Sequence, residues 1–390
     1  MKRVCLALLL AVFASAASAE TPYEINAILS LTGSGAAIGT AEAESLHLLE
    51  TNVNKSGGVR GRPVAFVIQD DHSSPQIALQ LATAVLAKKP PIIIGTTLVA
   101  GCSAILPVIA NGPVVYCLSA GMYPPKDSYM FSYGVPTKEA LRLQLKFFRD
   151  RGWKRVAAIF TTDATGQDFE RNLDTALALP ENRDMTLTAR ERFNVADVSV
   201  DAQVSRIKAA SPQALIAWAS GTPIGTVFHG MTDLDLTVPT ATNGPNINYN
   251  TMKQFANILP KELYFVNVPG IAPEAAPKGP LRTAAAAYFN TLKAAGVPPD
   301  AVHVFGWDPG TIVIAALKAL GFDAAPRQFK QYIANLHGYV GASGEYDFRD
   351  GSQRGLDGRS DIILRYDPQK QRFVAVQGAS GAALPRGESQ

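Results

Sequence analysis

Residues 91–118 read PIIIGTTLVAGCSAILPVIANGPVVYCL and carry the pattern that decides the fold. Two apolar runs, 91–95 and 113–118, flank a helix-like stretch at 103–111. Strands without polar alternation are typical of parallel sheets that helices cover on both faces. Two such strands joined by a helix predict a parallel β-α-β unit.

The same alternation extends along the chain in both directions. Further strands are expected at 23–30, 63–69, 155–160, 185–193, 214–218, 238–242 and 263–268. Helices are expected at 41–54, 76–87, 138–151, 169–179, 200–209, 224–232, 280–295 and 310–320, and the region 344–376 is expected to be rich in strands. The pattern restarts after about residue 136, which predicts two doubly wound α/β units. No linker rich in Ser and Gly separates them, which favours two lobes joined by several short crossings.

Composition excludes several classes of protein. The chain has 390 residues, of which 47% are hydrophobic and 18% charged, as is usual for globular proteins. The formal net charge of +3 gives no reason to expect nucleic acid or a membrane surface as a partner.

The N-terminus has the features of a secretory signal peptide. Lys2 and Arg3 precede an apolar run, 4–14, and Ala17-Ser18-Ala19 forms a small-residue cleavage site. The run is too short to span a bilayer. We therefore expect cleavage after Ala19 and a periplasmic mature protein.

Export leaves two cysteines, Cys102 and Cys117, in an oxidising compartment. They either pair as a disulfide or remain two small buried side chains.

The sequence shows no catalytic or metal-binding motif. It lacks the phosphate-binding loop, the His-Glu-x-x-His pair and the Gly-x-Ser-x-Gly elbow. The segment 33–39, GSGAAIG, approaches the dinucleotide fingerprint, but its third glycine comes one residue late. We therefore expect no cofactor, no metal and no enzymatic activity, and a loop that lets a ligand approach the backbone at a helix N-terminus.

Short motifs occur along the chain in a recognisable order and spacing. They are Leu31-Thr32-Gly33, Asn54 to Gly61, Asp70-Asp71, Ile94-Gly95, Thr161 to Gly166, Phe305 to Asp308 and Gly344 to Asp350. Together they resemble the periplasmic solute-binding proteins of ABC importers, of the leucine/isoleucine/valine-binding type.

The resemblance implies two Rossmann-like lobes joined by a three-strand hinge, with the ligand cleft between them. Lobe 1 would hold 20–136 and 269–341, and lobe 2 would hold 138–266 and 344–390. The crossings would lie near 135–137, 266–269 and 341–343. Such a protein is expected to be a monomer that closes on its ligand and delivers it to a membrane permease.

Ligands of open α/β sheets sit beyond the carboxyl ends of the strands. In the resembled family, the loops after the third and fourth strands bind the ligand carboxylate. Here these loops are 98–103 and 119–121. They supply five candidates: Cys102, Ser103, Ser119, Ala120 and Gly121. For the two serines, helix capping or turn formation is the alternative role.

The second lobe departs from the amino-acid-binding pattern. Amino-acid binders of the resembled family place a carboxylate near the ligand ammonium, but the matching segment, 242–246, contains no acid. A buried ammonium needs an anionic partner. We therefore predict a carboxylate ligand without an α-ammonium and with a body that is either aromatic or otherwise hydrophobic. Further candidate residues are Tyr133, Thr165, Ser220 and Asn243, with Phe131 and Trp218 as possible walls. Asp163 either reaches an ammonium or caps the following helix.

Three alternative functions remain open from the sequence. The first is a branched-chain amino acid or amide carrier of the same family. The second is an extracytoplasmic sensor lobe, and the third is an exported enzyme, which would need a nucleophile–base pair.

Overall fold

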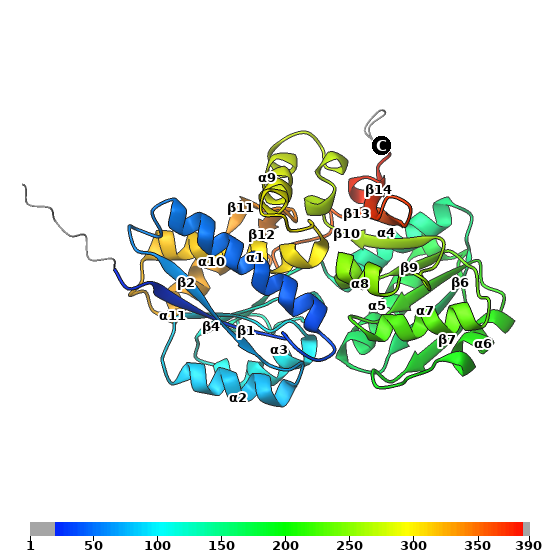
Figure 1. The fold of residues 1–390 in the computed structure, drawn as a ribbon, viewed down its shortest axis with the longest axis horizontal. Coiled ribbons are helices and arrows are strands. Elements are labelled where there is room, and N and C mark those ends of the chain that lie inside the picture. Colours follow the sequence, from blue (N-terminus) through cyan, green and yellow to red (C-terminus); the bar gives the residue numbers. More distant parts are fainter. Residues whose placement is uncertain (1–19, 385–390) are drawn as a thin grey trace, which may run out of the picture.

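The computed structural model describes residues 20–384, and these form two α/β lobes that lie side by side (Figure 1). The signal peptide predicted at 1–19 lies outside the described residues.

The first lobe is built on a five-stranded sheet with the order β2-β1-β3-β4-β5, and all its pairs are parallel. Its strands are β1 (Tyr23–Leu29), β2 (Val64–Asp70), β3 (Ile92–Gly95), β4 (Val114–Cys117) and β5 (Met130–Ser132). Helices α2 (Pro75–Leu86) and α3 (Val99–Ile105) cover one face, and α1 (Ala36–Lys55) and α10 (Ala301–Leu320) cover the other. A further helix, α11 (Pro326–Ala334), packs beside α10.

The second lobe is built on a seven-stranded sheet with the order β14-β13-β10-β9-β8-β6-β7. The parallel strands are β6 (Arg155–Thr161), β7 (Thr186–Phe193), β8 (Ala214–Trp218), β9 (Thr240–Thr242) and β10 (Leu263–Asn267), and the antiparallel pair is β13 (Ile362–Asp367) and β14 (Arg372–Gln377). Its helices are α4 (Thr137–Asp150), α5 (Ala164–Leu177), α6 (Asp201–Ala209), α7 (Pro223–Asp233) and α8 (Tyr249–Gln254). Helices α4 and α5 cover one face of this sheet, and α6 and α7 cover the other.

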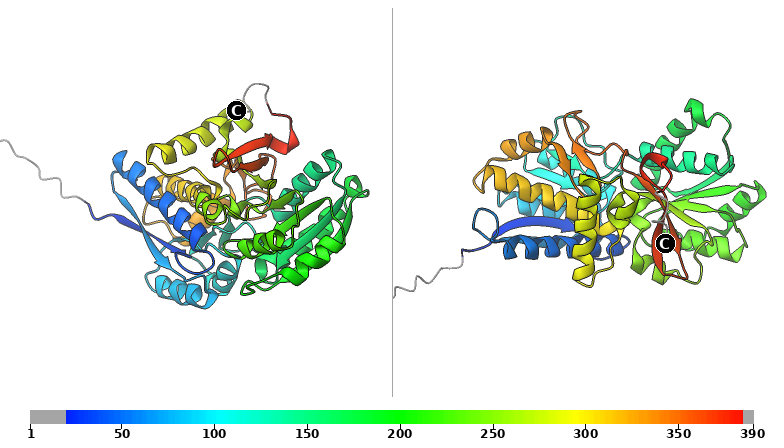
Figure 2. Two further views of the ribbon diagram at one scale, coloured as in Figure 1. Left: turned by 45° about the vertical axis from the view of Figure 1, so that its right-hand side comes forward. Right: turned by 90° about the horizontal axis from the view of Figure 1, so that it is seen from above.

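The chain passes between the two sheets after β5, after β10 and before β13. Helix α9 (Pro280–Ala294) follows the second passage and lies over the junction of the lobes (Figure 2). A small hairpin, β11 (His337–Val340) and β12 (Glu345–Asp347), precedes the third.

The third crossing lies later in the chain than we predicted. Gln353 donates through Nε2 to the carbonyl of Met130 (2.8 Å) and accepts at its own carbonyl from the amide of Ser132 (2.9 Å). These bonds attach the segment around Gln353 to the β5 edge of the first sheet. The chain joins the second sheet only at Ile362. The crossing therefore falls between 354 and 362 rather than at 341–343, because the segment extends the β5 edge of lobe 1.

Several helices begin earlier than the sequence pattern predicts. Helix α10 begins at Ala301 rather than at 310, because Asp300 caps its first turn and Pro309 is tolerated inside it. Helices α1 and α5 also begin about a turn earlier than predicted. Each contains a glycine within its first turns, and this glycine makes the start of the helix resemble a loop in the sequence. Helices α8 and α11 were not predicted.

Those two glycines allow each helix to lie against the end of the preceding strand. A Cβ atom on Gly39 would lie 2.2 Å from the carbonyl oxygen of Ser30, and one on Gly166 would lie 1.6 Å from that of Thr161. In the near-fingerprint at 33–39, the late glycine thus serves helix–strand packing.

We expect Gly39→Ala to destabilise the protein by about 1–3 kcal/mol, because the added methyl group forces α1 away from β1. Chemical denaturation monitored by circular dichroism measures this change. The control is Thr40→Ala at an exposed neighbouring position, which should change stability by less than about 0.5 kcal/mol. Equal stability of Gly39→Ala and the wild type would contradict the packing role.

Candidate functional site

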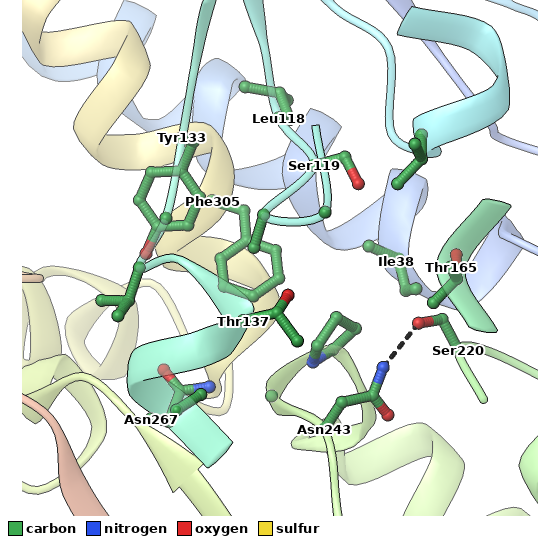
Figure 3. A pocket seen from close by; sticks show the side chains of 18 of the residues that line it. Ile38, Leu118, Ser119, Tyr133, Thr137, Thr165, Ser220, Asn243, Asn267 and Phe305 are labelled. Carbon is green, nitrogen blue, oxygen red and sulfur yellow. Dashed lines mark hydrogen bonds between the residues drawn. The ribbon is translucent and has the colours of Figure 1, made fainter. Parts of the chain in front are cut away.

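A cavity lined by residues of both lobes lies between them (Figure 3). Beside it the lobes touch directly. A Cβ on Gly221 of lobe 2 would lie 2.2 Å from the carbonyl oxygen of Ser34 of lobe 1, and Asn248 donates through Nδ2 to the carbonyl of Ala37 (3.3 Å). The structure therefore shows the cleft in a closed form.

Seven of the ten predicted site residues line this cavity. They are Ser119, Ala120, Gly121, Tyr133, Thr165, Ser220 and Asn243. Trp218, which we considered as a wall, lines it too. Ligand binding by these residues stays a prediction.

The other three predicted residues do not line the cavity. Cys102 is buried and forms a disulfide with Cys117, with their Cα atoms 6.0 Å apart. Ser103 donates through Oγ to Sδ of Met122 (3.7 Å). Cys102 thus packs in the lobe interior and Ser103 is exposed outside the cavity, so the loop after β3 reaches the cavity through other residues.

Asp163 is a helix cap. Its Oδ1 accepts from the amide of Gly166 (3.1 Å) and from the hydroxyl of Thr161 (2.6 Å). Of the two roles that we left open, the structure shows capping. Phe131 is likewise no wall of the cavity, because it packs edge-on against Phe348 in the core.

The loop after β4 presents unused hydrogen-bond donors. The backbone N–H groups of Ser119, Ala120 and Gly121 make no hydrogen bond within residues 20–384. The hydroxyls of Ser119 and of Thr165, at the start of α5, also have no partner among the described residues (Figure 3). Adjacent backbone donors of this kind suit an anionic oxygen.

The loop after β3 was placed in the site, but its residues Thr97, Leu98 and Val99 were not singled out. The Thr97 hydroxyl donates to Oε2 of Glu42 (2.6 Å) and accepts from the amide of Ser30 (3.1 Å). These two hydrogen bonds fix the Thr97 side chain, which forms part of the floor of the cavity.

Glu42 lies behind this floor and is fully buried. Burial raises the pKa of Glu42 to about 8, although the hydrogen bond from Thr97 opposes the rise. When Glu42 is protonated at neutral pH, it still accepts the hydrogen bond from Thr97 in the loop, but it places no full negative charge behind that loop.

Two carboxyl groups line the cavity that the sequence analysis missed: Asp168 and Asp361. The segment 242–246 holds no acid, as the sequence analysis noted, but lobe 2 brings a carboxyl group to the cavity from elsewhere, through Asp168 of α5. Asp168 lies within α5, beyond the loop that follows β6, so a search limited to the loops at strand ends does not find it. Asp361 directly precedes β13, whereas the search considered only residues at the carboxyl ends of strands.

Asp168 already has hydrogen-bond partners. Its Oδ2 accepts from the hydroxyl of Thr137 (2.6 Å), and its Oδ1 accepts from Nδ2 of Asn172 (2.9 Å). Burial raises the pKa of Asp168, while the bond from Thr137 and the charge of Arg354 lower it. Its local partners thus use much of its capacity to accept hydrogen bonds.

Apolar side chains form most of the remaining wall. They are Ile38, Leu98, Val99, Leu118, Tyr133, Val135, Trp218, Pro245, Val266, Val268 and Phe305. The rings of Tyr133 and Phe305 pack with centroids 4.9 Å apart (Figure 3). The cavity therefore combines an apolar middle with polar groups at a few points, as is usual for small-molecule sites.

Within residues 20–384, no cluster of three or more His, Cys, Asp or Glu side chains could hold a metal ion. In the same range, no helix has the length and apolar character needed to cross a membrane.

The comparison with family models identifies the family. Residues 22–358 match the model described as periplasmic binding protein, so the chain belongs to that family. Membership implies an exported, periplasmic protein. No curated protein sequence matches the chain significantly.

Solved structures share the two-lobed fold. An extracellular ligand-binding receptor from Rhodopseudomonas palustris HaA2 has a TM-score of 0.80 and 21% identity over 91% of this chain and 99% of that one. A solute-binding protein of an ABC transporter from R. palustris in complex with benzoate has a TM-score of 0.77 and 18% identity over 94% and 99%.

The branched-chain amino acid transporter substrate-binding protein LivJ from Streptococcus pneumoniae, in complex with isoleucine, has a TM-score of 0.77 and 16% identity over 90% and 98%. At these identities the likeness shows the fold alone, which is the predicted pair of α/β lobes.

We expect the disulfide to stabilise the protein by about 3 kcal/mol, because it closes a loop of about 15 residues between α3 and β4. Denaturation with and without a reducing agent measures this. The matched control is the double variant Cys102→Ser, Cys117→Ser, whose stability should not respond to the reductant. A wild type that is equally insensitive, with free thiols detected, would show that the cysteines are unpaired.

We expect Glu42→Gln to change how stability depends on pH. Because the folded-state pKa of about 8 lies above the ordinary value of 4.5, the folded protein binds this proton more tightly than the unfolded chain does. The stability contributed by this proton is complete below about pH 4.5 and is lost as pH rises toward 8. Denaturation at pH 5, 6.5 and 8 should show the wild type losing stability relative to Glu42→Gln, and parallel curves would contradict the assignment.

Proposed function

We propose that this protein is the extracytoplasmic solute-binding component of an ABC importer, and that its ligand is a small carboxylate with a hydrophobic, aromatic body. The ligand is captured when the two lobes close, and it is released to a permease in the inner membrane. The protein acts as a monomer and performs no chemistry on the ligand.

The observation that carries the proposal is the set of free donors in the loop after β4. Three successive residues that line the cavity, Ser119 to Gly121, have backbone N–H groups without a partner in the described chain. Hydrogen bonds to an ionised acceptor are stronger than neutral ones. A carboxylate oxygen is the simplest ligand group that accepts several such bonds at once.

The cavity walls support an apolar ligand body. Tyr133, Trp218 and Phe305 come from different elements of the two lobes and from their junction, and all three face the cavity. Planar aromatic rings bury a large area at a small cost in conformational entropy. An acid with an aromatic ring, such as a benzoate or a phenylpropanoate, would place apolar surface against these walls.

An amino-acid ligand is the second candidate, and Asp168 is the observation that favours it. An ammonium near Asp168 would have to compete with the hydrogen bonds from Thr137 and Asn172. Asn243, at the position where amino-acid binders of the resembled family place an acid, donates to Ser220 Oγ (2.7 Å). These contacts favour a ligand without an ammonium group.

The related structures are consistent with either ligand class. One related structure is a complex with benzoate and another a complex with isoleucine, and a third, with a TM-score of 0.76, is a fatty acid ABC transporter substrate-binding protein from Thermomonospora curvata. Delivery to a permease and cleavage after Ala19 belong to the proposal and follow from the family and from the N-terminal sequence.

A thermal-shift screen of the mature protein tests the ligand class. We expect benzoate-type or phenylpropanoid acids to raise the unfolding midpoint and amino acids not to raise it. Ligand at 100 times its Kd adds about 2.7 kcal/mol of stability, which is a shift of a few degrees for a protein of this size. A shift with leucine or isoleucine and none with the acids would overturn the proposed ligand.

The residue test compares two serines near the same loop. Ser119→Ala should weaken binding of the best acid about tenfold or more, because a hydrogen bond to a charged group is lost. Ser103→Ala, whose hydroxyl contacts Met122 outside the cavity, should leave the affinity unchanged. Calorimetric titration measures both, and equal affinities for the two variants would place the carboxylate elsewhere.

A further inference from the structure

Asp361 is a buried carboxyl group that lacks a hydrogen-bond partner. Its side chain lines the cavity although the residue is only 2% exposed. Neither carboxyl oxygen makes a hydrogen bond within the described residues; Oδ1 is enclosed by the protein, so Oδ2 is the oxygen open to the cavity. Asp168, the other acid of the cavity, accepts hydrogen bonds at both oxygens, whereas Asp361 accepts none at its side chain.

Asp361 lies at the hinge side of the cavity. It directly precedes β13, and its neighbour Ile362 pairs with Asn267 at the end of β10. In Figure 3, Asn267 appears on the opposite side of the cavity from Ser119 and Thr165. A ligand whose carboxylate contacts the loop at 119–121 would therefore extend its body toward Asp361.

Leaving such a carboxyl group without a partner costs free energy. An unpaired polar group in a buried position destabilises the folded protein, because it has given up its hydrogen bonds to water. Buried polar atoms in native proteins almost always have a partner, so an exception at a ligand cavity points to a partner that the ligand supplies.

The surroundings of Asp361 favour a neutral carboxyl group. Burial raises the pKa of Asp361 to about 8, and the charges of Glu139 and Asp357 add to the rise. A protonated carboxyl group donates one hydrogen bond and accepts others. A hydroxyl group has the same combination, whereas a second ligand carboxylate would be repelled by the nearby acids.

We propose that Asp361 hydrogen-bonds a hydroxyl group carried by the ligand at the end away from its carboxylate. The inference rests on the proposed function and narrows the ligand class to hydroxylated apolar acids. Asp361 is then a specificity-determining residue: it adds affinity for a hydroxylated acid and little for the acid without the hydroxyl group, which leaves the carboxyl group unpaired.

Matched acid pairs test the inference. The probes are benzoate with 4-hydroxybenzoate, and 3-phenylpropanoate with 3-(4-hydroxyphenyl)propanoate, titrated calorimetrically into the mature protein. We expect the wild type to bind the hydroxylated member of at least one pair about tenfold or more tightly. Asp361→Asn, whose neutral amide also donates and accepts, should keep part of this preference. Asp361→Leu should abolish it.

Two further measurements separate a binding role from a structural one. Without ligand, Asp361→Asn and Asp361→Leu should unfold at temperatures no lower than the wild type, because the carboxyl group they remove has no partner in the protein. Asp163→Asn, which alters the cap of α5 outside the cavity, should keep the wild-type preference.

Each contrary outcome has a distinct meaning. If the acids bind but show no hydroxyl preference, or if Asp361→Leu keeps it, the role of Asp361 is overturned and the proposed function stands. If no acid binds, both are overturned. If amino acids bind instead and Asp361→Asn abolishes their binding, Asp361 contacts an ammonium and the hydroxyl assignment is wrong.

Discussion

The buried guanidinium of Arg354 holds the parts of the site in one arrangement. It donates to the carbonyl of Met122, to that of Ala120 (2.6 Å) and to that of Gly134 (2.9 Å). One side chain from the C-terminal segment thus fixes both the loop after β4 and the first passage between the lobes. Arg354 therefore occupies the carbonyl of Ala120, in the same loop whose N–H groups at 119–121 have no partner among the described residues.

The same group connects the two lobes. The guanidinium carbon of Arg354 lies 4.5 Å from the ring centroid of Tyr123, and the Tyr123 hydroxyl accepts from the amide of Thr137 at the start of α4 (2.9 Å). Thr137 in turn donates to Asp168 on α5. Because a buried cation without its acceptors is costly, this chain of contacts resists rearrangement of the hinge side of the cleft. In the proposed closure, the contact that would form and break is the outer one, where Gly221 meets Ser34.

Much of the fold could be predicted from the chain, because strand and helix periodicity is a local property. Apolar runs such as Ile92 to Ile94 indicated the parallel sheets, and the strand ends indicated the loops of the site. Proline and glycine inside α10 concealed its first half, because such residues usually end helices. The third crossing was misplaced, because its position depends on Gln353 bonding to a distant strand edge.

The same limit applies to the site. The sequence located the loops after β3 and β4, but Cys102 and Ser103 do not line the cavity. The direction of their side chains depends on how α3 is rotated about its axis, which the sequence pattern does not reveal. Asp168 and Asp361 were missed, because only tertiary packing brings them to the cleft. Sequence resemblance thus locates the cleft, while packing decides which side chains a ligand would meet.

Ligand-driven closure is the central claim, and small-angle X-ray scattering tests it most directly. The radius of gyration should be measured for the mature protein alone and with a saturating concentration of the acid that stabilises it most. We expect the ligand-free protein to be larger and the radius to fall on binding toward that of the closed structure. An unchanged radius, with binding established by calorimetry in the same sample, would contradict capture by closure.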